Sequence, residues 1–138
     1  MRVSETLRDL ACQLQSLIRQ AAASQGLTAT QAYVLFAVPV DGIALSALAH
    51  QLGLDASTIS RIIDKMASRN WVKRQPQPTD RRVIHVVLTG DGQTMYRQLC
   101  DHIDHNVETL LGEVDSASQE KLSSDLEDLS WRLLRLQA

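Results

Sequence analysis

The 138-residue chain lacks several features that would define other classes of protein. Its two cysteines, Cys12 and Cys100, lie far apart and match no C-x-x-C pattern, so neither a disulfide framework nor a zinc ribbon is expected. No apolar run approaches the roughly eighteen residues that a membrane span needs, and the N-terminus lacks the apolar core of a secretory signal. We therefore expect a cytoplasmic protein with no membrane partner.

Signals of catalysis are also scarce. Ser60 has no evident histidine partner, and no glycine-rich phosphate loop is present. Paired carboxylates such as Glu127 and Asp128 fall on the polar side of a leucine-striped segment, where they serve solubility. The sequence thus predicts neither an enzyme nor a bound cofactor.

The charges that are present divide the chain unevenly. Residues 1–54 are balanced, with three basic and three acidic residues. Residues 55–88 carry seven basic residues against three acidic ones, a net charge of +4, whereas residues 89–138 carry four against ten, a net charge of −6. The near-neutral total therefore hides a basic segment that could bind a polyanion.

Apolar periodicity predicts helices for most of the chain. Leucines at steps of three and four predict an amphipathic helix over residues 3–24. Thr28 and Gln31 have the spacing of a capping box at the start of a second helix, which should stop before Pro39.

From Ser46 onward, two helical patterns are separated by a break at Gly53. Asp55 stands where the N-cap of the second helix belongs, and Asn70, which tolerates a left-handed backbone, should end it. Two helices joined this tightly form a helix-turn-helix. Turn residues and the strand-forming "VIHVVL" then predict a β-hairpin with Arg81 and Arg82 at its tip.

The C-terminal third should form two more helices. Thr89 is expected to cap the first, and Ser116 and Gln119 to form a capping box for the second. The second repeats Leu122, Leu126, Leu129, Leu133 and Leu136, a narrow stripe typical of helices that pack lengthwise on partners. We expect one mainly α-helical domain, residues 1–138, with a small β-hairpin wing. In it, residues 28–89 form a winged helix-turn-helix, and residues 3–24 and 90–137 form a helical dimerisation region.

The hairpin also carries the pattern Asp-x-Arg-x-x-x-apolar-x-Leu-Thr, as Asp80, Arg82, Val86, Leu88 and Thr89. With the preceding "LGLDASTISRIIDKMASRNWVKR", this pattern resembles the MarR family of bacterial transcriptional regulators over nearly the whole chain. Asn70 and Trp71 depart from the family's usual Gly-Leu. The resemblance implies an obligate homodimer, built from the first and the last two helices, that binds double-stranded DNA.

The main hypothesis is DNA binding by the helix of residues 56–69 and the hairpin. The helix should enter a major groove, and Arg82 resembles the wing residue that enters a narrow A·T-rich minor groove. Asp80 is expected to form a salt bridge with an arginine. The predicted DNA-binding residues are Ser57, Thr58, Ser60, Arg61, Lys65, Arg69, Lys73, Arg74, Asp80, Arg81 and Arg82. An isolated Arg-Arg pair is more often a solvated turn, but half of the fourteen basic residues lie between 61 and 82.

Regulators that resemble this chain often release DNA when a small aromatic or phenolic anion binds. Such an effector must prefer one spacing of the two recognition helices. Candidate lining residues are Arg19, Thr30, Tyr33, Phe36 and Trp71, although Tyr33 and Phe36 also suit a core. The expected outcome is repression by occlusion of a promoter at a pseudo-palindromic operator, with half-sites about one helical turn apart.

Three alternatives stay open. In a redox-responsive regulator Cys12 would sense oxidants, although "LACQLQSL" favours a buried, inert thiol. In a metal-responsive regulator a site near Cys100, His102, Asp104 and His105 would need further ligands from elsewhere. The third alternative is a winged-helix protein-interaction module, an antirepressor or co-regulator, and salt-sensitive operator binding would distinguish it from a DNA-binding regulator.

Overall fold

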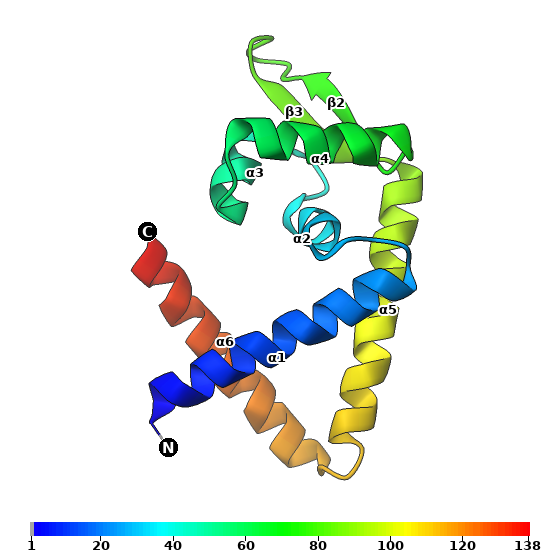
Figure 1. The fold of residues 1–138 in the computed structure, drawn as a ribbon. Helices are drawn as coiled ribbons and strands as arrows, with labels where there is room; N and C mark the ends of the chain where they lie inside the picture. The colour runs from blue at the N-terminus through cyan, green and yellow to red at the C-terminus, as the bar shows by residue number, and fades with distance from the viewer. Residues whose placement is uncertain (1) are drawn as a thin grey trace. The chain divides into compact units, whose positions relative to one another are not determined.

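The computed structural model describes residues 2–138, which form six helices and three strands (Figure 1). In chain order the elements are α1 (Val3–Ser24), α2 (Ala29–Ala37), β1 (Ile43–Ala44), α3 (Leu45–Leu52), α4 (Ala56–Ser68), β2 (Val72–Pro76), β3 (Ile84–Leu88), α5 (Gly90–Leu111) and α6 (Ser116–Gln137). The residues up to Ile103 form one compact unit, and Asp104–Ala138 form a second. The boundary lies inside α5, whereas the predicted division lies at residue 89.

The sheet combines the predicted hairpin with a strand that the sequence does not predict. The strand order is β1-β3-β2, and both pairs are antiparallel. β2 pairs with β3 from Val72 opposite Leu88 onward, and the two-residue β1 places Ile43 opposite Val86. Because β1 is so short, it has no alternating pattern that could be recognised.

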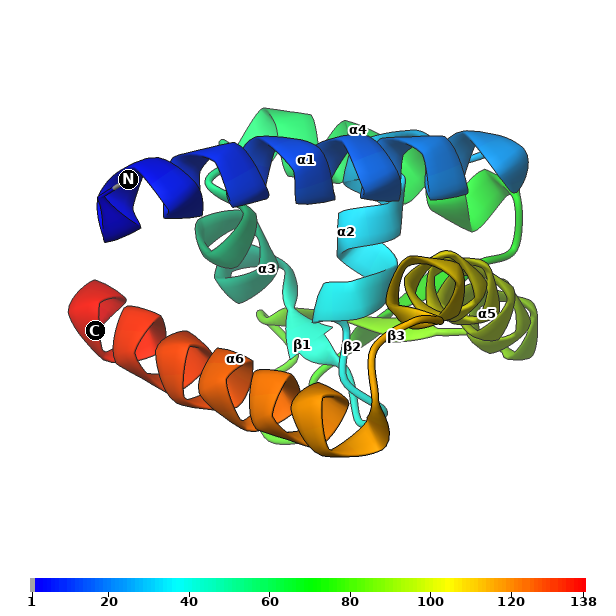
Figure 2. The same ribbon diagram turned by 90° about the horizontal axis from the view of Figure 1, so that it is seen from below.

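The core of the first unit lies between the helices and the sheet. Figure 2 shows α2 beneath α1, with α3 beside it. From α4, Ile59, Ile63 and Met66 enter this core and are at most 1% exposed. The other core residues are Ala21, Ala22, Leu27, Ala32, Val34, Leu35, Val38, Leu48, Ala49, Trp71, Val72, Val86 and Leu99.

Local side-chain bonds begin and end these helices largely where the sequence predicts. At the start of α2, Thr28 Oγ1 accepts a hydrogen bond from Gln31 N at 3.1 Å, and Gln31 Oε1 accepts one from Thr28 N at 3.0 Å. Gly53, with φ of 66°, ends α3, and Asn70, with φ of 60°, follows α4. Both left-handed residues let the chain reverse direction sharply.

The end of α4 is locked to the start of α5. Thr89 Oγ1 accepts a hydrogen bond from Gly92 N at 3.0 Å, which confirms the predicted cap, and its hydroxyl donates to Asn70 O. Asn70 Nδ2 also donates to Asp91 Oδ2 at 2.9 Å. A Cβ on Gly92 would collide with the carbonyl group of Trp71, so only glycine fits there.

The second unit corrects one predicted cap. Asp115, not Ser116, is the N-cap of α6, because its Oδ2 accepts from Ser118 N at 3.0 Å and its Oδ1 accepts from Ser118 Oγ at 2.7 Å. These bonds, the Ser118 hydroxyl first, lower the pKa of Asp115. Gln119 Nε2 instead donates to the carbonyl oxygens of Leu111 and Val114, at 3.2 and 2.8 Å.

The leucine stripe of α6 is largely open. No residue of α6 is buried, and Leu122, Leu126, Leu133 and Leu136 are 41 to 83% exposed. The first half of α1 shows the same feature, because Leu10 and Leu14 are 39 and 47% exposed. In the part of the chain that is described, no helix has the length and apolarity needed to cross a membrane.

Candidate nucleic-acid interface

The first turn of α4 is fixed by the carboxylate of Asp55. Its Oδ1 accepts hydrogen bonds from Thr58 N at 2.7 Å and from Ser57 Oγ at 2.8 Å. These bonds, the Thr58 backbone N–H first, lower the pKa of Asp55 from its ordinary 3.8 to about 2. Because the Ser57 hydroxyl donates its hydrogen bond to Asp55, its oxygen can act toward solvent only as an acceptor.

One face of α4 is exposed and carries free cations. Ser57, Arg61 and Lys65 follow each other at i, i+4 spacing, so their side chains lie along the same side of the helix. Within residues 2–138, the side chains of Arg61 and Lys65 form no hydrogen bond or ion pair. Thr58, beside them, is half-buried.

Ser60 and Arg74, two further predicted DNA contacts, are bonded to each other. Arg74 Nη1 forms a 2.6 Å salt bridge with Asp64 Oδ1, and Arg74 Nη2 donates to Ser60 Oγ at 2.8 Å and to Ser60 O at 3.1 Å. These bonds join β2 to the exposed side of α4. A direct DNA contact by either residue stays a prediction, and both are engaged within the protein.

The hairpin tip presents the two adjacent arginines to solvent. Asp80 Oδ1 accepts a hydrogen bond from Arg82 N at 3.0 Å, and Val83 N donates to Asp80 O at 3.1 Å, so a tight turn displays Arg81 and Arg82. The predicted salt bridge of Asp80 is wrong, since no arginine or lysine in residues 2–138 is paired with it. The carboxylate instead bonds to the backbone of the turn, which is the commoner role of aspartate there.

The two remaining predicted cations differ in their surroundings. Lys73 is exposed on β2 and has no partner among the described residues. The Arg69 guanidinium lies 5.2 Å from the centre of the Trp71 ring, and its Nη1 donates to Gly26 O at 3.5 Å. Arg69 therefore supports the end of α4, whereas Lys73 is free to meet an anion.

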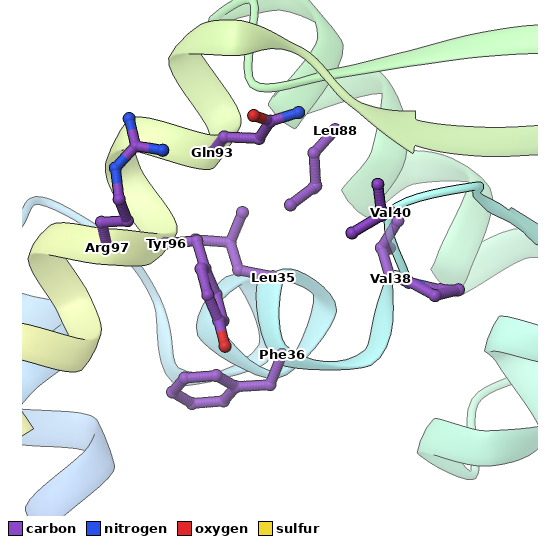
Figure 3. A pocket seen from close by; sticks show the side chains of 9 residues that line it. Leu35, Phe36, Val38, Val40, Leu88, Gln93, Tyr96 and Arg97 are labelled. Atoms are coloured by element: carbon purple, nitrogen blue, oxygen red, sulfur yellow. The ribbon is translucent and has the colours of Figure 1, made fainter.

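A separate cavity of about 410 Å³ lies in the first unit between the end of α2 and the start of α5 (Figure 3). Its walls are mostly apolar, and its polar groups all come from α5. The lining residues are Leu35, Phe36, Val38, Pro39, Val40, Leu88, Gln93, Tyr96 and Arg97. The rings of Phe36 and Tyr96 meet edge to face, with centroids 6.2 Å apart.

Of the five predicted ligand-binding residues, only Phe36 lines this cavity. Arg19 is exposed on α1, Thr30 and Tyr33 are half-buried on α2, and Trp71 is buried beneath Arg69. A ligand role for these four stays a prediction that this cavity does not support. Gln93, Tyr96 and Arg97 were not predicted from the sequence, because no local sequence signal shows that the start of α5 lies beside α2. An aromatic residue next to an arginine on the exposed side of a long helix was the only available signal.

Among residues 2–138, the structure does not support the redox-responsive or the metal-responsive alternative with a built site. Cys12 is exposed on α1, so the expectation of a buried thiol is wrong; it lies on the opposite side of the helix from the leucine stripe. Cys100 is half-buried. Residues 2–138 contain no group of three or more His, Cys, Asp or Glu side chains that could hold a metal ion.

A three-stranded sheet, a tight helix-turn-helix and a basic hairpin define a winged helix-turn-helix protein. The family model of the MarR family matches residues 27–84, which contain α2, β1, α3, α4 and β2 and end at the first residue of β3. Residues 27–84 of this chain therefore match the MarR family, and the resemblance predicted from the sequence is confirmed over this segment.

Individual relatives agree with this assignment. The multiple antibiotic resistance protein MarR of Salmonella typhimurium is 34% identical over 73 residues, 52% of this chain and 51% of that protein. The transcriptional repressor MprA of Escherichia coli is 30% identical over 89 residues, 64% of this chain and 48% of that protein. The chain thus matches about half the length of these curated relatives.

The fold likeness extends over almost the whole chain. The crystal structure of wild-type E. coli MarR in its apo form has a TM-score of 0.80 and 21% identity, and covers 94% of this chain and 96% of that chain. The mainly α-helical fold with a small antiparallel sheet, as predicted, is confirmed.

Proposed function

We propose that this protein is a transcriptional repressor that binds double-stranded DNA as a homodimer in the cytoplasm. The observation that carries the proposal is the set of unpaired cations on one compact unit: Arg61 and Lys65 on α4, Lys73 on β2, and Arg81 and Arg82 at the wing tip. An exposed helix N-terminus beside a basic hairpin suits a major groove flanked by a minor groove.

The distribution of unpaired and paired charges supports DNA over a smaller anion. The unpaired cations are spread over α4, β2 and the hairpin tip, an arrangement that suits an extended polyanion. By contrast, on α6 Lys121 and Arg132 are paired with Asp125 and Asp128 one turn away, at 2.7 and 2.9 Å. Neutralisation of phosphates by unpaired side chains releases counterions and makes binding strongly salt-dependent.

The open leucine stripes support assembly with a second copy of the chain. A run of exposed leucines along α6, together with Leu10 and Leu14 of α1, is more apolar surface than a monomer normally leaves uncovered. Two-fold association is the commonest way to cover such a surface. A dimer would carry two α4 helices, which would read the half-sites of a pseudo-palindrome.

The cavity between α2 and α5 supports release by a small ligand. Its apolar walls suit an aromatic body, and Arg97 supplies one positive group for a carboxylate or phenolate. Such a ligand would release DNA only if it bound more tightly to the conformation that does not fit the operator. The name of the relative MprA, a transcriptional repressor, supports repression as the outcome, and we propose that it acts by occluding a promoter.

The decisive experiment starts with selection of bound duplexes from a random pool. The selected site should be pseudo-palindromic, and its affinity should fall steeply as salt rises, by a slope of about 0.9 per phosphate contacted. Arg61→Ala should weaken binding, whereas Arg132→Ala, which removes an equal charge from α6, should not. A chain that enriches no site, or whose binding is insensitive to salt, would contradict the proposal.

A further inference from the structure

Arg74 differs from every other cation of the proposed interface in how its guanidinium is used. Three bonds tie it to Ser60 and Asp64, which lie one turn apart on α4. Its side chain is 34% exposed, whereas that of Asp64 is 61% exposed, so the arginine is the more enclosed partner. A phosphate contact by Arg74 would have to replace these bonds.

We propose that Arg74 is a positioning residue that sets the orientation of the wing relative to α4, and that it does not bind DNA. This inference rests on the proposed function, because it concerns the same interface. A planar guanidinium fork bonded at two levels of one helix restrains both the distance and the twist between α4 and β2, which a single-point contact would not do.

The position of the clamp within the hairpin explains its effect. Arg74 lies in the middle of β2, opposite Val86 of β3, while Arg82 lies beyond the end of the ladder. Apart from the clamp, the hairpin is held by the pairing of β1 with Val86 and His85 and by the buried side chains of Val72 and Val86, and its turn, residues 77–83, lies beyond these pairings. A small rotation at Arg74 therefore moves the tip by a larger distance, away from the groove next to the one that α4 occupies.

The direction in which Asp64→Asn changes DNA affinity distinguishes a positioning role of Arg74 from a phosphate contact. If Arg74 were a phosphate ligand, Asp64→Asn would remove an acidic group from the interface and free the arginine, so DNA binding should tighten. If Arg74 positions the wing, Asp64→Asn removes the ion pair and loosens the clamp, so binding should weaken. We expect weakening of roughly ten-fold, because misplacement of a recognition element costs affinity even when no contact is removed.

The salt dependence gives a second readout, with Lys73→Ala as the matched control. Lys73 neighbours Arg74 on the same strand, faces the other side and is unpaired. On the operator selected from a random pool, Lys73→Ala should reduce the salt slope by about one, as loss of a phosphate contact does. Arg74→Ala should weaken binding with the slope unchanged, and Arg74→Ala with Asp64→Asn should be no weaker than either alone. A slope reduced by Arg74→Ala would overturn the inference.

Arg74→Lys adds a conservative test. A lysine keeps the charge that a phosphate needs but cannot reach Ser60 and Asp64 with a fork, so we expect it to bind DNA about as weakly as Arg74→Ala. Full affinity in Arg74→Lys would count against positioning.

Residual dipolar couplings of the free protein keep the inference testable even if no duplex is bound. Arg74→Ala should change the orientation of the hairpin relative to α4, and Lys73→Ala should not. An unchanged orientation in Arg74→Ala would overturn the clamp by itself, whereas failure of the wild-type chain to bind any duplex would overturn only the proposed function.

Discussion

The helices α4 and α6 carry the same kind of aliphatic stripe and differ in what covers it. On α4, Ile59, Ile63 and Met66 are at most 1% exposed, whereas on α6 the stripe leucines Leu126 and Leu133 remain 46 and 43% exposed. A stripe buried inside its own chain stabilises the fold at any concentration. A stripe left open can contribute only when a partner covers it. The same periodicity thus serves folding in one helix and, as we propose, assembly in the other.

The charges of the two regions differ in the same way. The segment that contains α4 and the hairpin has a net charge of +4, and residues 89–138 have a net charge of −6. An acidic C-terminal region repels DNA, so a polyanion is directed to α4 and the wing. The following predictions would sharpen or break this division of roles.

Disruption of the open stripe should have the largest effect on DNA binding. Leu126→Asp with Leu133→Asp would bury charges in the proposed dimer interface, and should yield monomers by analytical ultracentrifugation. Because a monomer engages one half-site, operator affinity should fall by about 100-fold or more. Ser124→Asp, on the opposite side of α6, is the control. A double variant that remains a tight-binding dimer would place the interface elsewhere.

Truncation of the two stripes should separate folding from assembly. Ile63→Ala leaves a cavity in a fully buried site and should cost about 2–5 kcal/mol of unfolding free energy at every protein concentration. Leu126→Ala should destabilise only through the dimer, so its effect should depend on protein concentration. Chemical denaturation at several concentrations measures both. Equal, concentration-independent losses would break the comparison.

Removal of the wing arginine should have a moderate and sequence-dependent effect. Arg82→Ala should cost roughly ten-fold in affinity, with the largest loss at operators flanked by A·T-rich tracts, where a narrow minor groove attracts a guanidinium. Arg135→Ala, on α6, removes the same charge from the acidic region. Fluorescence anisotropy on A·T- and G·C-flanked duplexes gives the ratio. A loss that is uniform across flanks would assign Arg82 to a phosphate.

The two aspartate caps should give the smallest effect and respond to acid. The pKa of Asp55 is about 2 in the folded protein and ordinarily 3.8, so its stabilisation is complete above pH 4 and is lost as the pH falls toward 2. Asp115 on α6, whose pKa is also lowered, should follow the same direction. Asp55→Asn keeps an acceptor without the titration, and should flatten this part of the melting temperature against pH. An unchanged acid limb in Asp55→Asn would contradict the assignment.

Most helix ends could be predicted because residues close in the sequence determine them. Contacts between elements that are distant in the sequence could not be predicted. Thr28, Asp55 and Asn70 act through bonds to residues a few positions away, so their residue types and spacing sufficed. The prediction that Ser116 caps α6 was wrong, because Asp115, one position earlier, offers a stronger acceptor. The Arg74 clamp depends on two elements meeting in space, and a basic residue on a strand looks the same whether it faces DNA or an aspartate. The cavity beside Tyr96 was hidden for the same reason.

The tight fit of Gly92 against Trp71 has a mechanical consequence. There is no room for a methyl group at Gly92, and Asn70, which follows α4, is bonded to Thr89 and Asp91 at the start of α5. The beginning of α5 and the end of α4 are therefore held together and turn as one body. A change in the direction of α5 would therefore be passed on to α4, and with it to the DNA-binding surface that we propose. Under the proposed function, a ligand that turned the start of α5 would act on DNA binding by turning α4 with it.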